Sequence, residues 1–386
     1  MQFESKLPDV GTTIFTVMSR RALEEGAINI GQGFPDYPID PGLTQALLAV
    51  VAEGHNQYAP MEGVLALRAV IADKLHASYG LAVDPATEIT VTCGATESLY
   101  NAIQTVLRAG EEAIIFDPAY DVYEPAVRLA GARCVRLMLK PPGFRYDWDE
   151  VRAAITPRTR LIIINSPQNP CCTVISRADL DELAACVRDR PITVLSDEVY
   201  EHVVFDGKAH ASVLLHPELK ARSYAVFSFG KTLHATGWRT GYCVAPPDMT
   251  SELRKVHQFN TFSIVSPLQH AIARYLSTNP DVWRGLAAFF QAKRDRLAGL
   301  LRGSGLEPVG AAGTYFQLID YSALSDEDDL QFADRLLREA KVAVIPLSPF
   351  YAAPPAMRLV RLCTAKHDAT LDTAAGRLRD FARRAS

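Results

Sequence analysis

The chain has 386 residues, 48% of them hydrophobic and 22% charged, and it carries a formal net charge of −4 at pH 7. This length favours two lobes or one large domain with additions, and the charge leaves no basic face for nucleic acid. No apolar stretch reaches membrane-spanning length, and residues 1–15 lack the charged segment and apolar run of an export signal. We therefore expect a cytoplasmic protein that binds a small molecule and neither nucleic acid nor a membrane.

The seven cysteines and nine histidines show neither a disulfide pattern nor a metal-binding pattern. No CxxC, CxxxC or HxxxH spacing is present, and free thiols are typical of a reducing compartment. The adjacent Cys171 and Cys172 suit a turn of small residues better than a redox pair. We predict no metal.

Short apolar runs alternate with amphipathic runs from about Glu88 to Ala245. Strands rich in β-branched residues are predicted over residues 88–94, 111–118, 160–167, 191–198 and 223–230. Between them, helical periodicity extends over residues 95–110, 121–131 and 176–190. This alternation predicts an α/β fold, a mostly parallel sheet with helices on both faces.

The pattern changes near the C-terminus. Isolated strand-like segments, TYFQLID, VAVIPL and MRLVRLC, and two more helices predict a second, smaller α+β lobe. We expect a continuous helix around Pro280 to Leu301 to join the two lobes.

Polar or small residues directly follow several of the predicted strands, in CGATES, NSPQNP, SDEVYEH and SFGKT. Ligands of such sheets bind beyond the carboxyl ends of the strands, so chemistry is expected at this edge. Nucleotide-binding and hydrolase motifs fit poorly. GQGFPD lacks the strand, the helix start and the final glycine of a dinucleotide fingerprint, and no GxxxxGK[ST] or GxSxG is present.

Lys231 lies in SFGKTLHATGWRTG, with Arg239 eight residues further on. Burial beside another cation lowers the pKa of a lysine, which favours a role as nucleophile or base. Asp197 ends a strand apolar enough to be buried, where a lone carboxylate is costly unless a positive group faces it. A protonated pyridine nitrogen would be such a group.

Seven segments resemble, in order, the class I/II aminotransferases of the fold type I pyridoxal phosphate enzymes: NQYAPMEG, GATES, FDPAYDVYEP, NSPQNP, SDEVYEH, SFGKTLHATGWRTGY and MRLVRLC. Within this class they look most like the methionine aminotransferases and the kynurenine aminotransferase and glutamine transaminase K group. The likeness extends from about Gly31 to the end. It implies a large pyridoxal-phosphate-binding domain over residues 40–285, with a mostly parallel seven-stranded sheet, and a small domain of residues 1–39 and 286–386.

The resemblance also implies roles for single residues at the cofactor ring. Lys231 matches the lysine that forms the Schiff base with the cofactor and later moves the substrate's proton. Asp197 matches the acid that keeps the pyridine nitrogen protonated, so that the ring can accept electrons. Tyr200 and Asn169 match the pair that hydrogen-bonds the ring's 3-hydroxyl oxygen, and Tyr120 matches the aromatic residue that stacks on the ring.

Further positions match the family's phosphate contacts. The backbone amides of Ala95 and Thr96 would bind at a helix N-terminus, with a hydroxyl from Thr96 or Ser98. Ser228 and Arg239 complete the set, because the planar guanidinium of an arginine suits phosphate oxygens.

Arg361 matches the arginine that holds the substrate α-carboxylate, aided by Asn169 and the backbone of Gly33. Tyr58 matches a tyrosine that the family contributes from the partner subunit, which implies a homodimer with shared active sites. We identify no second arginine for a side-chain carboxylate. The expected donor is therefore a large neutral L-amino acid, methionine first and aromatic amino acids next, with a 2-oxo acid as the acceptor in a ping-pong cycle. Three apolar residues are further candidates for the side-chain pocket: Phe34, Tyr37 and Phe262.

The sequence departs from the family pattern at Gln168, where a histidine is usual, and at the CCTV that follows. We interpret Gln168 as a neutral hydrogen-bonding substitute. Two other functions stay open. One is a β-lyase acting on cysteine S-conjugates or cystathionine, since the same lysine and cofactor serve elimination. The other is a non-catalytic regulatory module, which the intact Lys231 and Asp197 disfavour.

Overall fold

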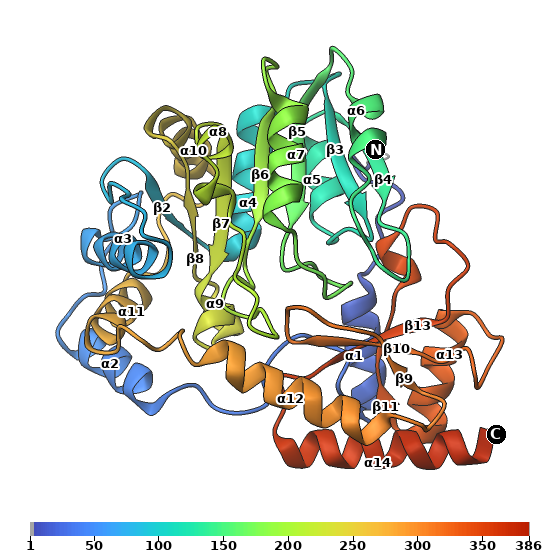
Figure 1. Ribbon diagram of the computed structural model, residues 1–386. Helices are drawn as coiled ribbons and strands as arrows, with labels where there is room; N and C mark the ends of the chain where they lie inside the picture. Colours follow the sequence, from blue (N-terminus) through green and yellow to red (C-terminus); the bar gives the residue numbers. More distant parts are fainter. Residues whose placement is uncertain (1–3, 386) are drawn as a thin grey trace.

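The computed structural model describes residues 4–385, and a seven-stranded sheet lies at its centre (Figure 1). The strand order is β2-β8-β7-β6-β5-β3-β4. Its strands are β2 (Ile89–Thr92), β3 (Glu112–Asp117), β4 (Arg133–Met138), β5 (Thr159–Asn165), β6 (Thr193–Asp197), β7 (Ser223–Ser228) and β8 (Gly241–Val244). Strand β8 runs antiparallel to both of its neighbours, and the other paired strands run parallel. The predicted mostly parallel seven-stranded sheet of an α/β fold is confirmed.

The central strands are apolar on both faces, because each face carries its own hydrophobic core. In β3, Ile114 and Phe116 belong to one core while Ala113 and Ile115 belong to the other. Strands covered on both sides read as continuous apolar runs, as these do. One face is covered by α4 (Gly94–Val106), α5 (Tyr123–Leu129) and α10 (Pro247–Asn260), and the other by α3 (Leu65–Tyr79), α6 (Trp148–Ala154) and α7 (Arg177–Val187).

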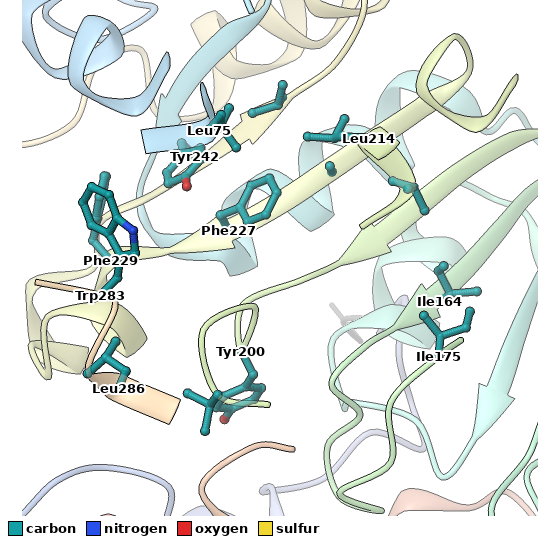
Figure 2. Close-up of a cluster of buried hydrophobic side chains, with 14 of the residues drawn as sticks. Leu75, Ile164, Ile175, Tyr200, Leu214, Phe227, Phe229, Tyr242, Trp283 and Leu286 are labelled. Atoms are coloured by element: carbon teal, nitrogen blue, oxygen red, sulfur yellow. The ribbon is translucent and has the colours of Figure 1, made fainter. Parts of the chain in front are cut away.

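The core beneath α3, α6 and α7 also contains several aromatic side chains. Figure 2 shows Phe227, Phe229 and Tyr242 beside Leu75, with Tyr200 on the loop that follows β6. The rings of Phe227 and Tyr242 stack with their centroids 5.0 Å apart. At the β2 end of the sheet, α11 (Ser266–Thr278) packs against both α3 and α2 (Pro41–Ala52).

A smaller antiparallel sheet has the order β12-β13-β10-β9 (Figure 1). Its strands are β9 (Glu307–Pro308), β10 (Phe316–Asp320), β12 (Ile345–Pro346) and β13 (Leu359–Cys363). Around it lie α1 (Ile14–Glu24), α12 (Leu286–Leu301), α13 (Asp329–Arg335) and α14 (Asp368–Ala385), and β1 (Ile28–Asn29) pairs with β11 (Val342–Ala343). A third core joins residues of α1 to residues 297–382. The N-terminal segment therefore packs with the C-terminal part of the chain.

Two predictions about the C-terminal elements are wrong. The continuous helix expected around residues 280–301 begins later than predicted, because residues 280–285 form turns and α12 begins at Leu286. Asn279 caps α11 by bonding the carbonyl of Tyr275, and the proline that follows cannot continue a helix. The segment VAVIPL is also divided, into β11 and β12, which belong to different sheets. Within residues 4–385, no helix is long and apolar enough to cross a bilayer.

Candidate active site

A cavity of about 230 Å³ lies at the carboxyl ends of the central strands, between the two sheets. It is lined by eleven of the predicted site residues: Gly33, Ala95, Thr96, Tyr120, Asn169, Asp197, Tyr200, Ser228, Lys231, Arg239 and Arg361. These residues come from segments that are far apart in the sequence. The fold therefore brings the predicted residues together in one place.

The parallel strands account for this convergence. Asn165, Asp197 and Ser228 are the last residues of β5, β6 and β7, and parallel strands carry their final residues to the same edge. The side-chain amide of Asn165 donates to the carbonyl of Asp197 over 2.9 Å. Lys231 follows directly, in the short helix α9 (Phe229–Thr232).

Lys231 is hydrogen-bonded by Tyr315, which directly precedes β10 of the small sheet. Its Nζ donates a 2.8 Å hydrogen bond to the hydroxyl of Tyr315, and it lies 5.6 Å from the ring centroid of Tyr200. Loss of hydration lowers the pKa of Lys231 to about 8, and the positive charges of Arg239 and Arg361 act in the same direction. A substantial fraction of this amine is therefore neutral near physiological pH and able to act as a base or nucleophile.

Asp197 is a buried carboxylate that has hydrogen bonds but forms no ion pair with the described residues, and the charge of Lys231 offsets only part of the cost of its burial. Its Oδ2 accepts a 2.7 Å hydrogen bond from the hydroxyl of Tyr123. Within residues 4–385, no lysine or arginine forms an ion pair with it. Burial raises the pKa of Asp197 to about 6. Such a site favours a ligand that brings a positive N–H group.

Arg361 lies on β13 and is buried with part of its guanidinium unsatisfied. Nη1 donates to the side-chain oxygen of Asn169 over 2.5 Å, and Nη2 donates to the carbonyl of Gly31 over 3.0 Å. The guanidinium lies 3.8 Å from the ring centroid of Phe316. Nε is buried and has no hydrogen-bond partner. A carboxylate in the cavity would accept a hydrogen bond from Nε and neutralise the positive charge of Arg361.

The N-terminus of α4 and Arg239 together form an anion cradle. Gly94 begins the helix at φ +70°, and a Cβ there would lie 2.8 Å from Nη2 of Arg239. A Cβ at Gly241 would lie 2.7 Å from the backbone nitrogen of Ala95. Arg239 also approaches Thr96, whose Oγ1 lies 3.4 Å from Nη2. The two glycines therefore allow the guanidinium and the helix amides to approach closely, an arrangement that binds phosphate well.

Several other predicted residues lie outside the cavity. Tyr58 is 87% exposed and packs edge-to-face against Phe262, with ring centroids 5.6 Å apart. Ser98 is buried and bonds Thr92, so the hydroxyl at the cradle is that of Thr96. The pocket candidates Phe34, Tyr37 and Phe262 are not among the lining residues.

Gln168 is buried behind the cavity rather than in it. Its side-chain nitrogen donates to the carbonyl of Pro118 over 2.7 Å, and its oxygen accepts from the amide of Cys171 over the same distance. The residue thus ties the turn that carries Asn169 to the segment that carries Tyr120. Its contact with the cofactor's surroundings is indirect.

Comparison with known proteins agrees with this geometry. Residues 25–378 match the family model described as aminotransferase class I and II. The chain belongs to this family. The methionine aminotransferase of Escherichia coli K12 is 51% identical over 378 residues, which cover 98% of each chain. A solved E. coli structure, that of YbdL, whose published description identifies a methionine aminotransferase function, superimposes with a TM-score of 0.97 and 50% identity, covering 98% of this chain and all of the other.

Other relatives of this aminotransferase differ in the substrate that they are named for. A probable N-succinyldiaminopimelate aminotransferase of Mycobacterium tuberculosis is 38% identical, with 98% of each chain covered. Kynurenine–oxoglutarate transaminase 1 of Homo sapiens is 30% identical, with 93% of each covered. The resemblance to class I/II aminotransferases, including the kynurenine group, is thus confirmed.

Aminotransferases of this family use pyridoxal phosphate, and the cavity fits that cofactor. The buried carboxylate of Asp197, which forms no ion pair within the described part of the chain, suits a protonated pyridine nitrogen. The cradle of α4 and Arg239 suits the phosphate, and the amine of Lys231 suits the cofactor's aldehyde.

Aromatic and apolar residues that the sequence did not predict complete the aminotransferase site. Phe15, Leu99, Val199 and Phe316 line the cavity, and Tyr315 lies directly behind it. Apolar residues carry no signal in a single sequence that separates a pocket wall from the core. Tyr123, the partner of Asp197, could have been found, because it lies in the motif FDPAYDVY.

Proposed function

We propose that this aminotransferase moves the amino group of a large neutral L-amino acid to a 2-oxo acid by a ping-pong mechanism, with methionine favoured and aromatic amino acids next. The observation that carries this proposal is the distribution of charge around the cavity. Its cationic lining residues are Lys231, Arg239 and Arg361, within the described chain. Lys231 suits the cofactor's aldehyde, Arg239 the phosphate and Arg361 the substrate's α-carboxylate. No lining cation is therefore left to bind an acidic substrate side chain. The 51% identity to a methionine aminotransferase supports the same substrate class.

Each end of the cofactor has its own proposed set of contacts. Asp197 would face the pyridine nitrogen, and Tyr200 and Asn169 would bond the 3-hydroxyl oxygen. Tyr120 would stack on the ring. The phosphate would be bound by the residues of the cradle and of the end of β7: Ala95, Thr96, Ser228 and Arg239. When bound, the cofactor supplies an electron-accepting ring that stabilises the negative charge left at the substrate's α-carbon.

Lys231 takes and returns the proton in this proposal. Its amine, with a pKa of about 8, would accept the α-proton of the donor at Nζ and return it to the C4′ carbon of the bound cofactor. The reverse transfer acts on the 2-oxo acid. Because the pKa lies close to the working pH, the amine can perform both transfers.

Arg361 sets the orientation of the substrate. Its free Nε and its charge bind the α-carboxylate, while Asn169 fixes Nη1 and the Gly33 backbone lies alongside. Arg361 belongs to the small sheet, so substrate binding draws that part of the chain toward the large sheet. Closure excludes water and favours transfer over side reactions.

We further propose that the active enzyme is a homodimer in which Tyr58 reaches the phosphate of the partner subunit. The exposure of Tyr58, together with that of Phe262 beside it, supports this, because large exposed aromatic side chains mark interaction surfaces. We assign a large domain to residues 40–285 and a small domain to residues 1–39 and 286–386, in keeping with the separate core around the small sheet. The free thiols of all seven cysteines support a cytoplasmic location.

The β-lyase alternative has no observation in its favour. A direct experiment compares L-methionine, L-phenylalanine and L-aspartate as donors with a common 2-oxo acid, and assays pyruvate and ammonia release from a cysteine S-conjugate without any 2-oxo acid. Methionine turnover above aspartate turnover, with no release of pyruvate, is expected. Faster turnover of aspartate, or release of pyruvate at a comparable rate, would contradict the proposal.

A further inference from the structure

Tyr315 forms a chain of two hydrogen bonds that ends at Lys231. Its hydroxyl lies 2.8 Å from Nζ of Lys231 and 2.7 Å from the carbonyl oxygen of Gly33. A carbonyl can only accept, and a phenol has a single proton. The proton of Tyr315 is therefore donated to Gly33, and its oxygen accepts an N–H of Lys231.

The direction of these two hydrogen bonds leaves the lone pair of a neutral Lys231 unoccupied. Because Tyr315 has no second proton, it cannot donate to the lone pair of a neutral Lys231. The amine is held through one of its N–H groups, and its lone pair stays available for a proton from elsewhere. Burial raises the pKa of Tyr315 well above its ordinary value, so the hydroxyl keeps its proton throughout the working range of pH.

The ring of Tyr315 is fixed on several sides. The residue is 1% exposed, and its ring centroid lies 5.0 Å from that of Tyr200, 5.0 Å from that of Phe316 and 5.5 Å from that of Phe290. Tyr315 directly precedes β10 of the small sheet, whereas Lys231 follows β7 of the large one. The hydroxyl thus joins the lysine, the small sheet and the N-terminal segment at Gly33.

We propose that Tyr315 is a positioning residue for Lys231: anchored on the carbonyl of Gly33, its hydroxyl holds the free amine and leaves the lone pair directed at the substrate's α-proton. This deepens the proposed function and rests on it. The hydroxyl matters during the part of the cycle in which Lys231 is not bonded to the cofactor. The other ionisable groups that face Lys231 are Asp197, Tyr200, Arg239, Arg361 and Cys363.

The substitution Tyr315→Phe removes the hydroxyl and keeps the ring. With L-methionine we expect kcat to fall about tenfold or more with little change in KM, since the general base is misplaced and carboxylate binding is intact. The primary isotope effect with α-deuterated L-methionine should rise, because proton transfer becomes slower relative to other steps. The control is Tyr321→Phe. Tyr321 is buried in the core around the small sheet, and its hydroxyl donates a 3.0 Å hydrogen bond to the carbonyl of Glu327, which this substitution removes. It should leave kcat and the isotope effect unchanged.

A second measurement uses the cofactor-free protein. The rate at which Lys231 reacts with added pyridoxal phosphate is followed against pH. Loss of an acceptor that stabilises the charged amine should lower the midpoint of this profile by about one pH unit in Tyr315→Phe, and not in Tyr321→Phe.

The proposal is overturned if Tyr315→Phe retains the wild-type isotope effect and the wild-type pH midpoint, even when the variant is less stable, since Tyr315 would then be a packing residue. Failure of the proposed function gives a different result. In that case the wild-type enzyme itself does not turn over methionine, and the pH midpoint in the cofactor-free protein still decides the role of Tyr315.

Discussion

The hydroxyl of Tyr123 donates a 2.7 Å hydrogen bond to the carboxylate of Asp197, and both side chains are buried. The bond orients the carboxylate but does not neutralise it, and burial raises the pKa of Asp197 to about 6. A negative charge in this position is costly until a cationic group faces it. The protonated pyridine nitrogen of the cofactor would supply that group. Cofactor binding should therefore offset the cost of burying the charged Asp197 and raise the free energy of unfolding.

The substitution Asp197→Asn tests the part of this carboxylate in catalysis. The amide keeps the shape of the side chain but cannot hold a positive charge on the ring nitrogen, so kcat should fall by roughly a hundredfold or more. Tyr123→Phe keeps the carboxylate and loses its orienting bond, and we expect a much smaller fall. Steady-state kinetics with saturating cofactor measure both. Nearly equal losses in the two variants would show that orientation matters more than charge.

The same carboxylate predicts a pH dependence of stability in the cofactor-free protein. Its pKa is raised in the folded state from 3.8 to about 6, so the stabilising contribution of the protonated form is complete below 3.8 and is lost as the pH rises through 6. Relative to Asp197→Asn, the wild-type protein should lose roughly 1 to 2 kcal/mol of unfolding free energy between pH 5 and pH 7.5. Urea unfolding of both proteins at the two pH values measures the difference. A constant difference would contradict the raised pKa.

The substitution Gly33→Ala is expected to weaken substrate binding. A Cβ at this position would lie 2.6 Å from the ring of Phe316, on which the guanidinium of Arg361 packs. In Gly33→Ala the ring must shift, and Arg361 shifts with it, so KM for methionine should rise about tenfold with a smaller change in kcat. Gly376→Ala is the control, because a Cβ there meets no other atom within 4 Å. An unchanged KM in Gly33→Ala would show that the ring accommodates the methyl group.

A buried ion pair lies beneath the loop that carries Tyr200. Nζ of Lys74 lies 2.5 Å from Oε1 of Glu201, and Tyr79 bonds the other carboxylate oxygen. Although burial raises the pKa of Glu201, His202, Lys74 and Tyr79 together lower it well below its ordinary value. Glu201→Gln leaves Lys74 as an uncompensated buried charge, which should cost about 3 to 5 kcal/mol of unfolding free energy.

The matched control for this pair is Glu182→Gln, which breaks the exposed ion pair of Glu182 with Arg152. Surface pairs of this kind contribute about 1 kcal/mol or less. Urea unfolding should therefore separate the two variants clearly. If Glu201→Gln and Glu182→Gln cost the same, Lys74 must be neutral in the folded protein.

The polar part of the site could be predicted from the sequence, because its chemistry leaves local signals. Asp197 and Asn165 each end an apolar run, and Lys231 and Arg239 lie in a segment of small and hydroxyl residues. The family motifs add the spacing that joins them to Arg361. The parallel arrangement of the sheet then follows from the alternation of strands and helices.

The remainder depends on contacts between distant segments. Lys74 and Glu201 are separated by 127 positions, and Tyr315 reaches Lys231 from 84 positions away. Neither pair has a periodic pattern that would reveal it. Strands β4 and β8 were not predicted from the apolar runs, because Arg133 and Arg136 interrupt the run in β4 and β8 contributes only Gly241–Val244 after a polar segment. Helix α12 was predicted to begin too early because the turn that starts at Pro280 was overlooked.

The most direct test of the central claim is the absorption spectrum of the purified protein before and after the addition of L-methionine without any 2-oxo acid. The proposed function predicts that the yellow band of the lysine-bound cofactor disappears and that it returns on addition of a 2-oxo acid. A yellow protein whose spectrum does not respond to methionine would contradict the proposed substrate. A protein that cannot be reconstituted with pyridoxal phosphate would contradict the assignment of the site.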